Sequence, residues 1–400
     1  MAYKYRLLPN EEQAQLINKT VGCARLMYNS LLMDYKQQLN SKVDKPRLKL
    51  TTFFNEQYTF LKEVDSLALM NARQNLKSAF DNFFKSRKGE RKGRRVGFPK
   101  CHKKSKSKLS YTTNSLSGTI RINENKIKLP KLGWINFVKH RELQGLIKHA
   151  TIEQTRDGKY YVSIIVELPD KVVTKRYTNR VVGLDMSFKE FVVDSDNTSN
   201  DMKPKYVRLY RSNERRLKRL QRRLSKRVKD SNNYNKARVK VAKLHCHITN
   251  CRMDFCHKMS RYYVDNYDVI VLEDINLQDM TKHGLRGHAK SINDMGFGMF
   301  RDFIKYKAED SGAIVVKVDK WYPSSKTCNH CGYVNKQLSL SDRQWICPNC
   351  GAIIERDENA ACNLRDCYLR NINTAGTAGI YACGDSVPTI VSNCDSKQYR

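Results

Sequence analysis

The chain has 400 residues, and its 74 Lys and Arg against 40 Asp and Glu give a formal net charge of +34. This excess of positive charge destabilises a compact protein by self-repulsion. We therefore expect a nucleic acid as the partner that neutralises it. A membrane protein and a secreted protein are both disfavoured, because the sequence has no apolar run of 18 residues and no signal-peptide core after Met1, and we expect a cytoplasmic protein.

The first 170 residues predict strands with a helical segment among them. Residues 2–8 alternate in the manner of a strand, and Asn10 then suits the N-cap of a helix. Apolar side chains at helical spacing predict a helical unit over about 10–85. Short alternating segments between 109 and 168 predict a small β-barrel. We expect strand 2–8 to join this barrel, with the helical unit inserted between its strands.

A basic segment links the helical unit to these strands. Residues 85–108 hold twelve Lys and Arg and one acid, interrupted by glycines and a proline. A solvated loop would explain this composition, but at +34 overall we interpret the segment as a clamp for phosphates. The backbone contacts expected here are Arg87, Lys88, Arg91, Lys92, Arg94 and Arg95.

The second half begins with an apolar strand that ends in an acid, Val181–Asp185. Residues 191–193 and 206–209 are predicted to be its hairpin partners. A helical hairpin is then predicted over 211–264, and its first limb, 211–229, carries ten Lys and Arg. The phosphate contacts expected on this limb are Arg215, Arg216, Arg219, Arg222 and Arg223.

A second buried strand, residues 267–273, also ends in an acid, Glu273. A helix over about 292–310 and a strand over 313–318 follow. After the cysteine region, residues 358–371 are predicted to be helical. The remaining tail is rich in Gly, Ala, Ser and Thr and is predicted to be mobile.

Four of the thirteen cysteines form two CxxC pairs separated by fifteen residues. They are Cys328, Cys331, Cys347 and Cys350. Two such turns bring four thiolates to one tetrahedral zinc ion, and Gly332 and Gly351 suit the tight turn that follows each pair. Because all four ligands are cysteines, the zinc is predicted to be structural. A further group of Cys and His between 245 and 257 lies along one predicted helix, and we interpret it as a helix face.

Three acids sit at the ends of predicted elements: Asp185, Glu273 and Asp357. A single acid at a strand end is usually a solvated turn residue, but three brought to one point repel unless Mg²⁺ bridges them. Two Mg²⁺ ions about 4 Å apart support phosphodiester hydrolysis. The order of strands, helices and acids is that of the RNase H fold, and the Asp-Glu-Asp order resembles RuvC resolvase rather than DNA-joining transposases, which end in Glu.

The motifs GLDMSFKEF, IVLEDIN, CNHCG, CPNCG and RDENAACN, in this order, are similar to those of the TnpB family of RNA-guided nucleases. Bacterial and archaeal insertion sequences encode this family, which is related to compact type V CRISPR effectors. The opening AYKYRLLPNEEQ and the stretch VGFPKCHKKSKSKLSYTTN also resemble it, so the likeness covers nearly the whole chain. One departure is WYPSS from Trp321, which replaces the Arg/Tyr-Thr-Ser run common before the first CxxC pair.

The resemblance implies an α/β multidomain protein with an RNase H-like RuvC nuclease domain and an N-terminal wedge β-barrel. The implied parts are the first wedge strand (1–9), a helical recognition domain (10–90), the rest of the wedge barrel (91–175), the RuvC domain (176–321), a zinc-ribbon insert that binds target nucleic acid (322–351), the last RuvC helix (352–373) and a flexible tail (374–400). The implied Mg²⁺-binding catalytic residues are Asp185, Glu273 and Asp357, supported by Arg356 and Asn359. The residues implied to read a short DNA motif are Asn71, Gln74, Asn75, Thr112, Thr113 and Asn114.

The partners implied are a structured guide RNA derived from the transposon end and a double-stranded target DNA, bound by a protein that is monomeric with its RNA and associated with the nucleoid when on DNA. The guide–target duplex of about 20 bp would be bound through its backbone, and the DNA would be cut beside the short motif. Two alternatives remain open: a compact type V CRISPR effector of the same fold, and a non-cleaving zinc-ribbon regulator of transposition.

Overall fold

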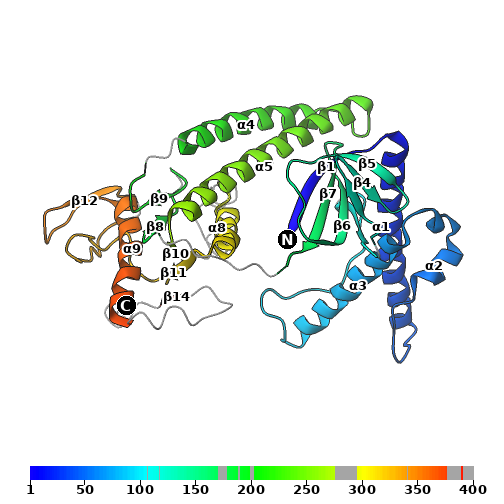
Figure 1. The fold of residues 1–400 in the computed structure, drawn as a ribbon, viewed down its shortest axis with the longest axis horizontal. Coiled ribbons are helices and arrows are strands. Elements are labelled where there is room, and N and C mark those ends of the chain that lie inside the picture. Colours follow the sequence, from blue (N-terminus) through cyan, green and yellow to red (C-terminus); the bar gives the residue numbers. More distant parts are fainter. Residues whose placement is uncertain are drawn as a thin grey trace. The chain divides into compact units, whose positions relative to one another are not determined.

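The computed structural model describes residues 1–105, 107–116, 118–169, 178–187, 190–198, 202–274, 295–339, 341–375 and 389–390. They form two compact units, Met1–Lys171 and Val172–Arg400 (Figure 1). Within these ranges, no helix combines the length and the apolar composition that a membrane span requires.

The first unit is an antiparallel sheet with helices inserted after its first strand. Its elements are β1 (Ala2–Leu8), α1 (Glu11–Asn40), α2 (Thr51–Gln57), the 3-10 helix η1 (Thr59–Glu63), α3 (Ser66–Arg87), β2 (Leu109–Asn114), β3 (Arg121–Asn123), β4 (Lys126–Leu129), β5 (Gly133–Val138), β6 (Leu146–Gln154) and β7 (Tyr160–Glu167). The strand order is β2-β6-β7-β1-β5-β4-β3. Strand β1 pairs with both β5 and β7, which confirms that residues 2–8 join the later strands. Closure of this sheet into a barrel stays a prediction.

Helix α1 begins as its sequence predicts. The Asn10 side chain accepts a hydrogen bond from the Gln13 N–H at 2.8 Å, and the Gln13 side chain accepts one from the Asn10 N–H at 3.1 Å. This capping box satisfies two of the amide groups that a helix start leaves unpaired. Helices α1 and α3 pack against each other and against β2, and Met27 and Leu76 are fully buried in their shared core.

The second unit is a mostly parallel sheet between helices. Its elements are β8 (Val181–Asp185), β9 (Val193–Asp194), α4 (Met202–Ser225), α5 (Asn232–Asn266), β10 (Val269–Glu273), α8 (Phe297–Ser311), β11 (Ile314–Val318), β12 (Gln344–Ile346), β13 (Ile353–Glu355), α9 (Arg356–Ala375) and β14 (Thr389–Ile390). The sheet order is β14-β11-β10-β8-β9, with β9 antiparallel to β8 and the other pairs parallel. The pair β12–β13 forms a separate small hairpin.

Both faces of this parallel sheet are covered (Figure 1). On β10, Ile270 and Leu272 pack into a core with α5 and α8, while Val269 and Val271 pack into a core with α9. Such two-sided burial explains why the strand is apolar along its length instead of alternating with polar residues.

Two predictions about secondary structure differ from the fold. Residues 206–209, predicted to be a strand, lie inside helix α4. Their aromatic and β-branched residues favour a strand locally. Over a longer range, however, the sequence repeats with the three- and four-residue spacing of a helix, at Tyr206, Leu209, Asn213, Leu217, Leu220 and Leu224. In the tail predicted to be mobile, Thr389–Ile390 pairs with β11 as β14. Residues 376–388 and 391–400 of that tail lie outside the described residues.

Candidate functional site

The parallel strands bring two of the predicted acids to the same edge of the sheet. Asp185 is the last residue of β8 and Glu273 is the last residue of β10. Leu272 is paired with Leu184, so the two acids follow side by side where the strands end. Asp357 lies in the first turn of α9, the helix that packs on β8. The three acids therefore come from three elements that meet at this edge.

A close approach of α9 to β8 fixes the position of Asp357. At Gly183, in the middle of β8, an added Cβ would lie 2.0 Å from the carbonyl oxygen of Ala361 and 2.7 Å from the amide nitrogen of Arg365. Any side chain at this position would force the helix away from the strand, so glycine permits the short distance between the two elements.

Burial and mutual repulsion raise the pKa values of two of these acids. Burial, and after it the charge of Asp357, raises the pKa of Asp185 to about 7, although Arg356 acts in the opposite direction. Burial, and after it the charge of Asp185, raises the pKa of Glu273 to about 7. The three carboxyl groups thus form one electrostatic cluster with Asp185 between the other two.

Two residues that the sequence did not single out contact Asp357. The hydroxyl of Ser187 donates a hydrogen bond to Oδ2 at 3.0 Å. One Nη of Arg343 lies 3.3 Å from both carboxylate oxygens. Arg343 stands between the two CxxC pairs, and nothing in its local sequence separates it from the other arginines. Arg356 points its side chain to the same loop, where its Nη1 donates to the carbonyl of Ser339 at 3.4 Å.

The four predicted zinc ligands converge. Their sulfur atoms lie within 4.8 Å of one another, with Cys328–Cys350 at 3.7 Å and Cys331–Cys347 at 3.5 Å. A tetrahedral ion with Zn–S bonds of about 2.3 Å requires sulfur atoms about 3.8 Å apart, so the cluster fits zinc. Gly332 and Gly351 have φ values of +77° and +71°, the conformation that glycine adopts without strain.

Among the described residues, only these four cysteines bring three or more potential metal ligands close enough together to hold one ion. Asp185, Glu273 and Asp357 do not form a group of this kind among the described residues, but they interact electrostatically: the charge of Asp357 adds to burial in raising the pKa of Asp185, and that of Asp185 does so for Glu273.

The segment that holds the four cysteines and the β12–β13 pair, residues 322–355, is called the zinc hairpin below. It is attached to α9, the helix that carries Asp357. The Asn359 side chain donates to the Thr327 carbonyl at 2.7 Å and accepts from the Asn329 N–H at 2.9 Å. The buried Asn363 side chain donates to the carbonyls of Ser324 and Thr327 at 2.7 and 2.6 Å. The hydrogen bonds of Asn359 thus join α9 to Thr327 and to Asn329 of the first CxxC turn, and its predicted support of the acids stays a prediction.

The second unit also carries the predicted basic limb. The five predicted arginines of α4 are exposed, and within the described residues none of them forms an ion pair. Between α4 and α5 lies a groove of about 610 Å³. Its cationic lining consists of Arg216, Arg219, Arg223, Lys240 and Lys243. In the first unit, the six predicted cations of segment 87–95 are exposed as well.

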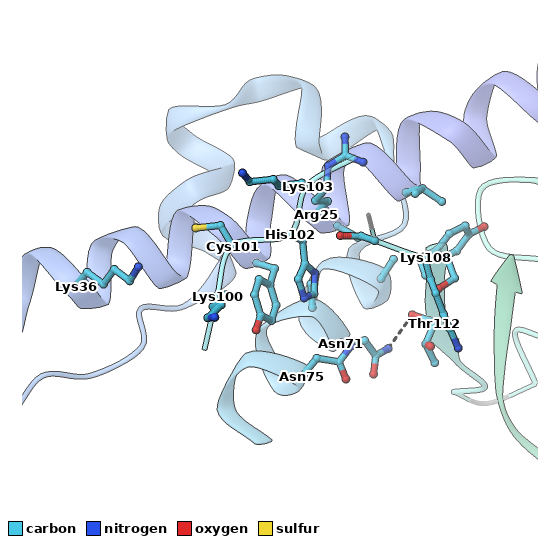
Figure 2. A pocket seen from close by; sticks show the side chains of 18 residues that line it. Arg25, Lys36, Asn71, Asn75, Lys100, Cys101, His102, Lys103, Lys108 and Thr112 are labelled. Carbon is cyan, nitrogen blue, oxygen red and sulfur yellow. Dashed lines mark hydrogen bonds between the residues drawn. The ribbon is translucent and has the colours of Figure 1, made fainter. Parts of the chain in front are cut away.

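A cavity of about 960 Å³ in the first unit gathers part of the predicted DNA-reading set (Figure 2). Asn71 and Asn75 of α3 and Thr112 of β2 line it, and Asn71 donates to the Thr112 carbonyl at 3.0 Å. Its cations are Arg25, Lys36, Lys100, Lys103 and Lys108. His102 also lines it, stacked on Tyr28 with ring centroids 4.0 Å apart.

Three members of that set do not line the cavity. Thr113 is fully buried, so the prediction that it reads DNA is wrong for this structure: strand alternation turns its side chain into the core while its neighbours face outward. Gln74 does not line the cavity. Asn114 does not line it either, but its side chain accepts a hydrogen bond from the lining residue Asn71 at 3.4 Å.

Three protein-family models match separate parts of the chain. Residues 163–284 match a family described as a probable transposase, OrfB of IS605. Residues 297–364 match the TNB domain of Cas12f1-like proteins, and this range contains the four cysteines. Residues 1–42 match the helix-turn-helix domain of OrfB of IS605, although the structure has strand β1 and the single helix α1 over that range.

The chain is also similar over nearly its full length to known proteins. A "putative RNA-guided DNA endonuclease" of Streptomyces pristinaespiralis is 34% identical over 96% of this chain and 91% of the relative. InsQ of Escherichia coli K12, which carries the same description, is 30% identical over 96% of this chain and 94% of its own length. The structure resembles that of Cas12f1 in its complex with sgRNA and target DNA, with a TM-score of 0.56, 15% identity and coverage of 89% and 83%.

Proposed function

This chain belongs to the TnpB family, the OrfB-type proteins of IS605 insertion sequences, and we propose that it is an RNA-guided DNA endonuclease encoded by such an element. In this proposal it cleaves double-stranded DNA beside a short duplex motif, and Asp185, Glu273 and Asp357 hold the catalytic ions. The observation that carries the proposal is the placement of these three acids at one sheet edge, where burial and, after it, the charge of Asp357 raise the pKa of Asp185.

The donor set fits Mg²⁺. Carboxylate oxygens are the ligands that this hard cation prefers, and a cation favours the joint ionisation at neutral pH of two half-buried acids with raised pKa values, because it offsets their repulsion. Bound Mg²⁺ supplies an activated water and stabilises the leaving oxygen of a phosphodiester. The protein holds the acids rigidly: Asp185 and Glu273 by strand pairing, and Asp357 by α9 and the Ser187 hydroxyl.

We assign the second unit to a RuvC nuclease domain with residues 322–351 as a zinc-ribbon insert, and the first unit to the wedge and recognition parts. Four cysteine ligands leave no position for water, so the zinc serves the fold. We expect one zinc per chain. Replacing Cys347 with Ser removes a buried ligand and should release the zinc, measured by metal analysis of the purified protein, whereas replacing the unliganded Cys101 should not.

The partners in this proposal are a guide RNA and its DNA target. The arginines of α4, the groove between α4 and α5, and segment 87–95 offer exposed cations to phosphates without reading bases. The cavity in the first unit combines cations with the amides of Asn71 and Asn75, the combination that suits base readout beside a phosphate backbone. We propose that the short duplex motif is read there.

The deciding experiment compares acid variants of the protein purified with its native RNA. Asp185→Ala, Glu273→Ala and Asp357→Ala should each reduce cleavage of guide-matched DNA by at least a thousandfold while RNA binding stays unchanged. Glu358→Ala is the matched control, because this exposed acid lies in the same helical turn as Asp357. Wild-type cleavage by any of the three acid variants would refute the site.

A compact CRISPR effector is the second candidate. Cas12f1 of Sulfoacidibacillus thermotolerans is 29% identical to this chain, but over 31% of it, so this likeness is more local than those to the TnpB-type relatives. Transposon ends beside the gene would support the insertion-sequence origin, and a repeat array would support the CRISPR one. A non-cleaving regulator is disfavoured because all three acids are present.

A further inference from the structure

Trp321 is the most exposed large apolar side chain in the described part of the chain, with 80% of its surface accessible. The other two tryptophans differ: Trp345 is buried in the zinc hairpin, and Trp134 is 44% exposed in the first unit. Leaving an indole in water gives up most of the stabilisation that its burial provides, so packing does not explain this residue.

The backbone holds Trp321 close to the acidic edge. Val318, the last residue of β11, is paired with Glu273, and Trp321 follows three residues later. Its amide donates to the Asp319 side chain at 2.8 Å in a tight turn. Three residues further, the Ser324 carbonyl accepts from Asn363 of α9. Three residues span about 11 Å at most, so Trp321 lies within that distance of Val318, which pairs with Glu273, and of Ser324, which is bonded to α9.

A cation accompanies the ring. The Nζ of Lys320 lies 4.9 Å from the centroid of the Trp321 ring. Proteins that bind single-stranded nucleic acid combine these two groups, since the ring stacks on a base and the cation attracts the neighbouring phosphates. In a duplex, both faces of a base are covered by its neighbours, so an exposed indole selects an unpaired strand.

We propose that Trp321 is a stacking platform for an unpaired base of the DNA strand that enters the carboxylate site. The assignment rests on the proposed nuclease function and adds a positioning residue to it. Because every base has a π-face, this contact holds a strand whatever its sequence, as a nuclease whose specificity resides in a guide requires.

Fluorescence tests the stacking without any cleavage. The RNA-bound Asp185→Ala/Trp134→Phe protein is titrated with oligothymidine and with an abasic oligonucleotide of the same length, which carries the same phosphates and no bases. We expect oligothymidine to quench the Trp321 emission and the abasic strand not to, and Trp321→Phe to abolish the quenching. Equal quenching by both strands, or none by either, would overturn the stacking.

Cleavage gives the second readout. At subsaturating guide-matched DNA, Trp321→Ala should cut about tenfold more slowly and Trp321→Phe close to wild type, because Phe retains a stacking face. Ile353→Ala is the control, since Ile353 is 75% exposed on the zinc hairpin but not aromatic. Wild-type rates for Trp321→Ala would contradict the proposal. A protein that cuts no DNA with any guide yet shows base-dependent quenching would refute the nuclease and retain the stacking.

Discussion

Asp185 and Glu273 are half-buried acids whose pKa values of about 7 lie well above their usual values of 3.8 and 4.5. At pH values between the usual pKa values and about 7, the folded protein binds more protons than the unfolded chain. The free energy of unfolding that these two groups contribute is therefore present at low pH and is lost as pH rises through about 7. We predict that the metal-free protein has a lower Tm at pH 8 than at pH 6, and that millimolar Mg²⁺ restores the Tm at pH 8.

The double variant Asp185→Asn/Glu273→Gln separates this effect from all other titrations. It retains the shape of both side chains but cannot ionise, so its Tm should depend less on pH and hardly at all on Mg²⁺. Identical pH profiles for the variant and the wild type would show that the two acids are not linked to stability.

At the residue scale, the sequence identified the groups that end strands and helices. Asp185 and Glu273 close apolar strands, and this position along a parallel strand is enough to place them at one edge. Ser187 and Arg343 could not be found in this way, because their contacts with Asp357 join segments 170 and 14 residues apart that only the tertiary fold brings together. Thr113 was predicted to read DNA because it lies beside Thr112 and Asn114, but side chains alternate along β2 and its own side chain is buried.

At the scale of elements, the packing of α9 on β8 depends on Gly183. A methyl group there would overlap the Ala361 carbonyl, so Gly183→Ala should lower the free energy of unfolding by about 3 kcal/mol and displace Asp357, with loss of cleavage. Chemical denaturation and a cleavage assay measure the two effects.

Gly22→Ala is the matched control for that variant. Gly22 lies in helix α1, and an added Cβ would meet nothing within 4 Å, so alanine should stabilise the helix by about 1 kcal/mol. If Gly183→Ala behaved like Gly22→Ala, the close approach of α9 would not be what positions the acid.

The attachment of the zinc hairpin to α9 makes a separate prediction. Asn363→Ala removes the donor to two carbonyls and should cost about 2 kcal/mol, loosening the segment before Cys328 without removing the zinc. Hydrogen exchange should rise over 322–331 while zinc content stays at one per chain. Asn335→Ala, which alters a local turn at Gln337, should leave that segment protected. Unchanged exchange in Asn363→Ala would contradict the anchoring role.

Most elements were predicted from local sequence patterns, and one of the two that were not lies in α4. Residues 206–209 have the composition of a strand, yet they extend a helical stripe that runs on to Leu224. The longer period prevailed because a helix gains from every turn it adds, whereas a short strand needs a neighbour to pair with. The two strands of the small hairpin β12–β13 were not predicted, because three residues are too few to show an alternating pattern. Only the cysteines around them were recognised.

At the scale of the whole molecule, a charge of +34 guarantees attraction to any polyanion, so binding to DNA at low salt would not distinguish a guided nuclease from an unguided one. We predict that the protein, expressed with its native downstream DNA, purifies with one discrete RNA that persists at about 0.5 M salt, where simple counterion-release binding is largely lost. Sequencing of the copurified RNA gives the measurement.

Retargeting completes that test. An RNA with a new guide segment should direct cutting to the matching DNA, and mismatches nearest the duplex motif should slow it most, because pairing begins there. RNA-free protein that cut many unrelated sites at an undiminished rate would instead identify an unguided nuclease of the same fold.

The hydrogen bonds that join Asn359 and Asn363 to the segment before the first zinc turn define where this protein can be recombined with a relative. A chimaera that exchanges residues 322–351 as a cassette would leave the recipient's α9 facing foreign carbonyls, and it would separate Arg343 from the acid it contacts. The junction between the two proteins should instead lie after Asp366, because the Asp366 carboxylate accepts a hydrogen bond from the Asn329 side chain at 2.7 Å. The unit of exchange is therefore residues 322–351 together with the first half of α9, which carries Asp357, one of the three acids proposed to be catalytic.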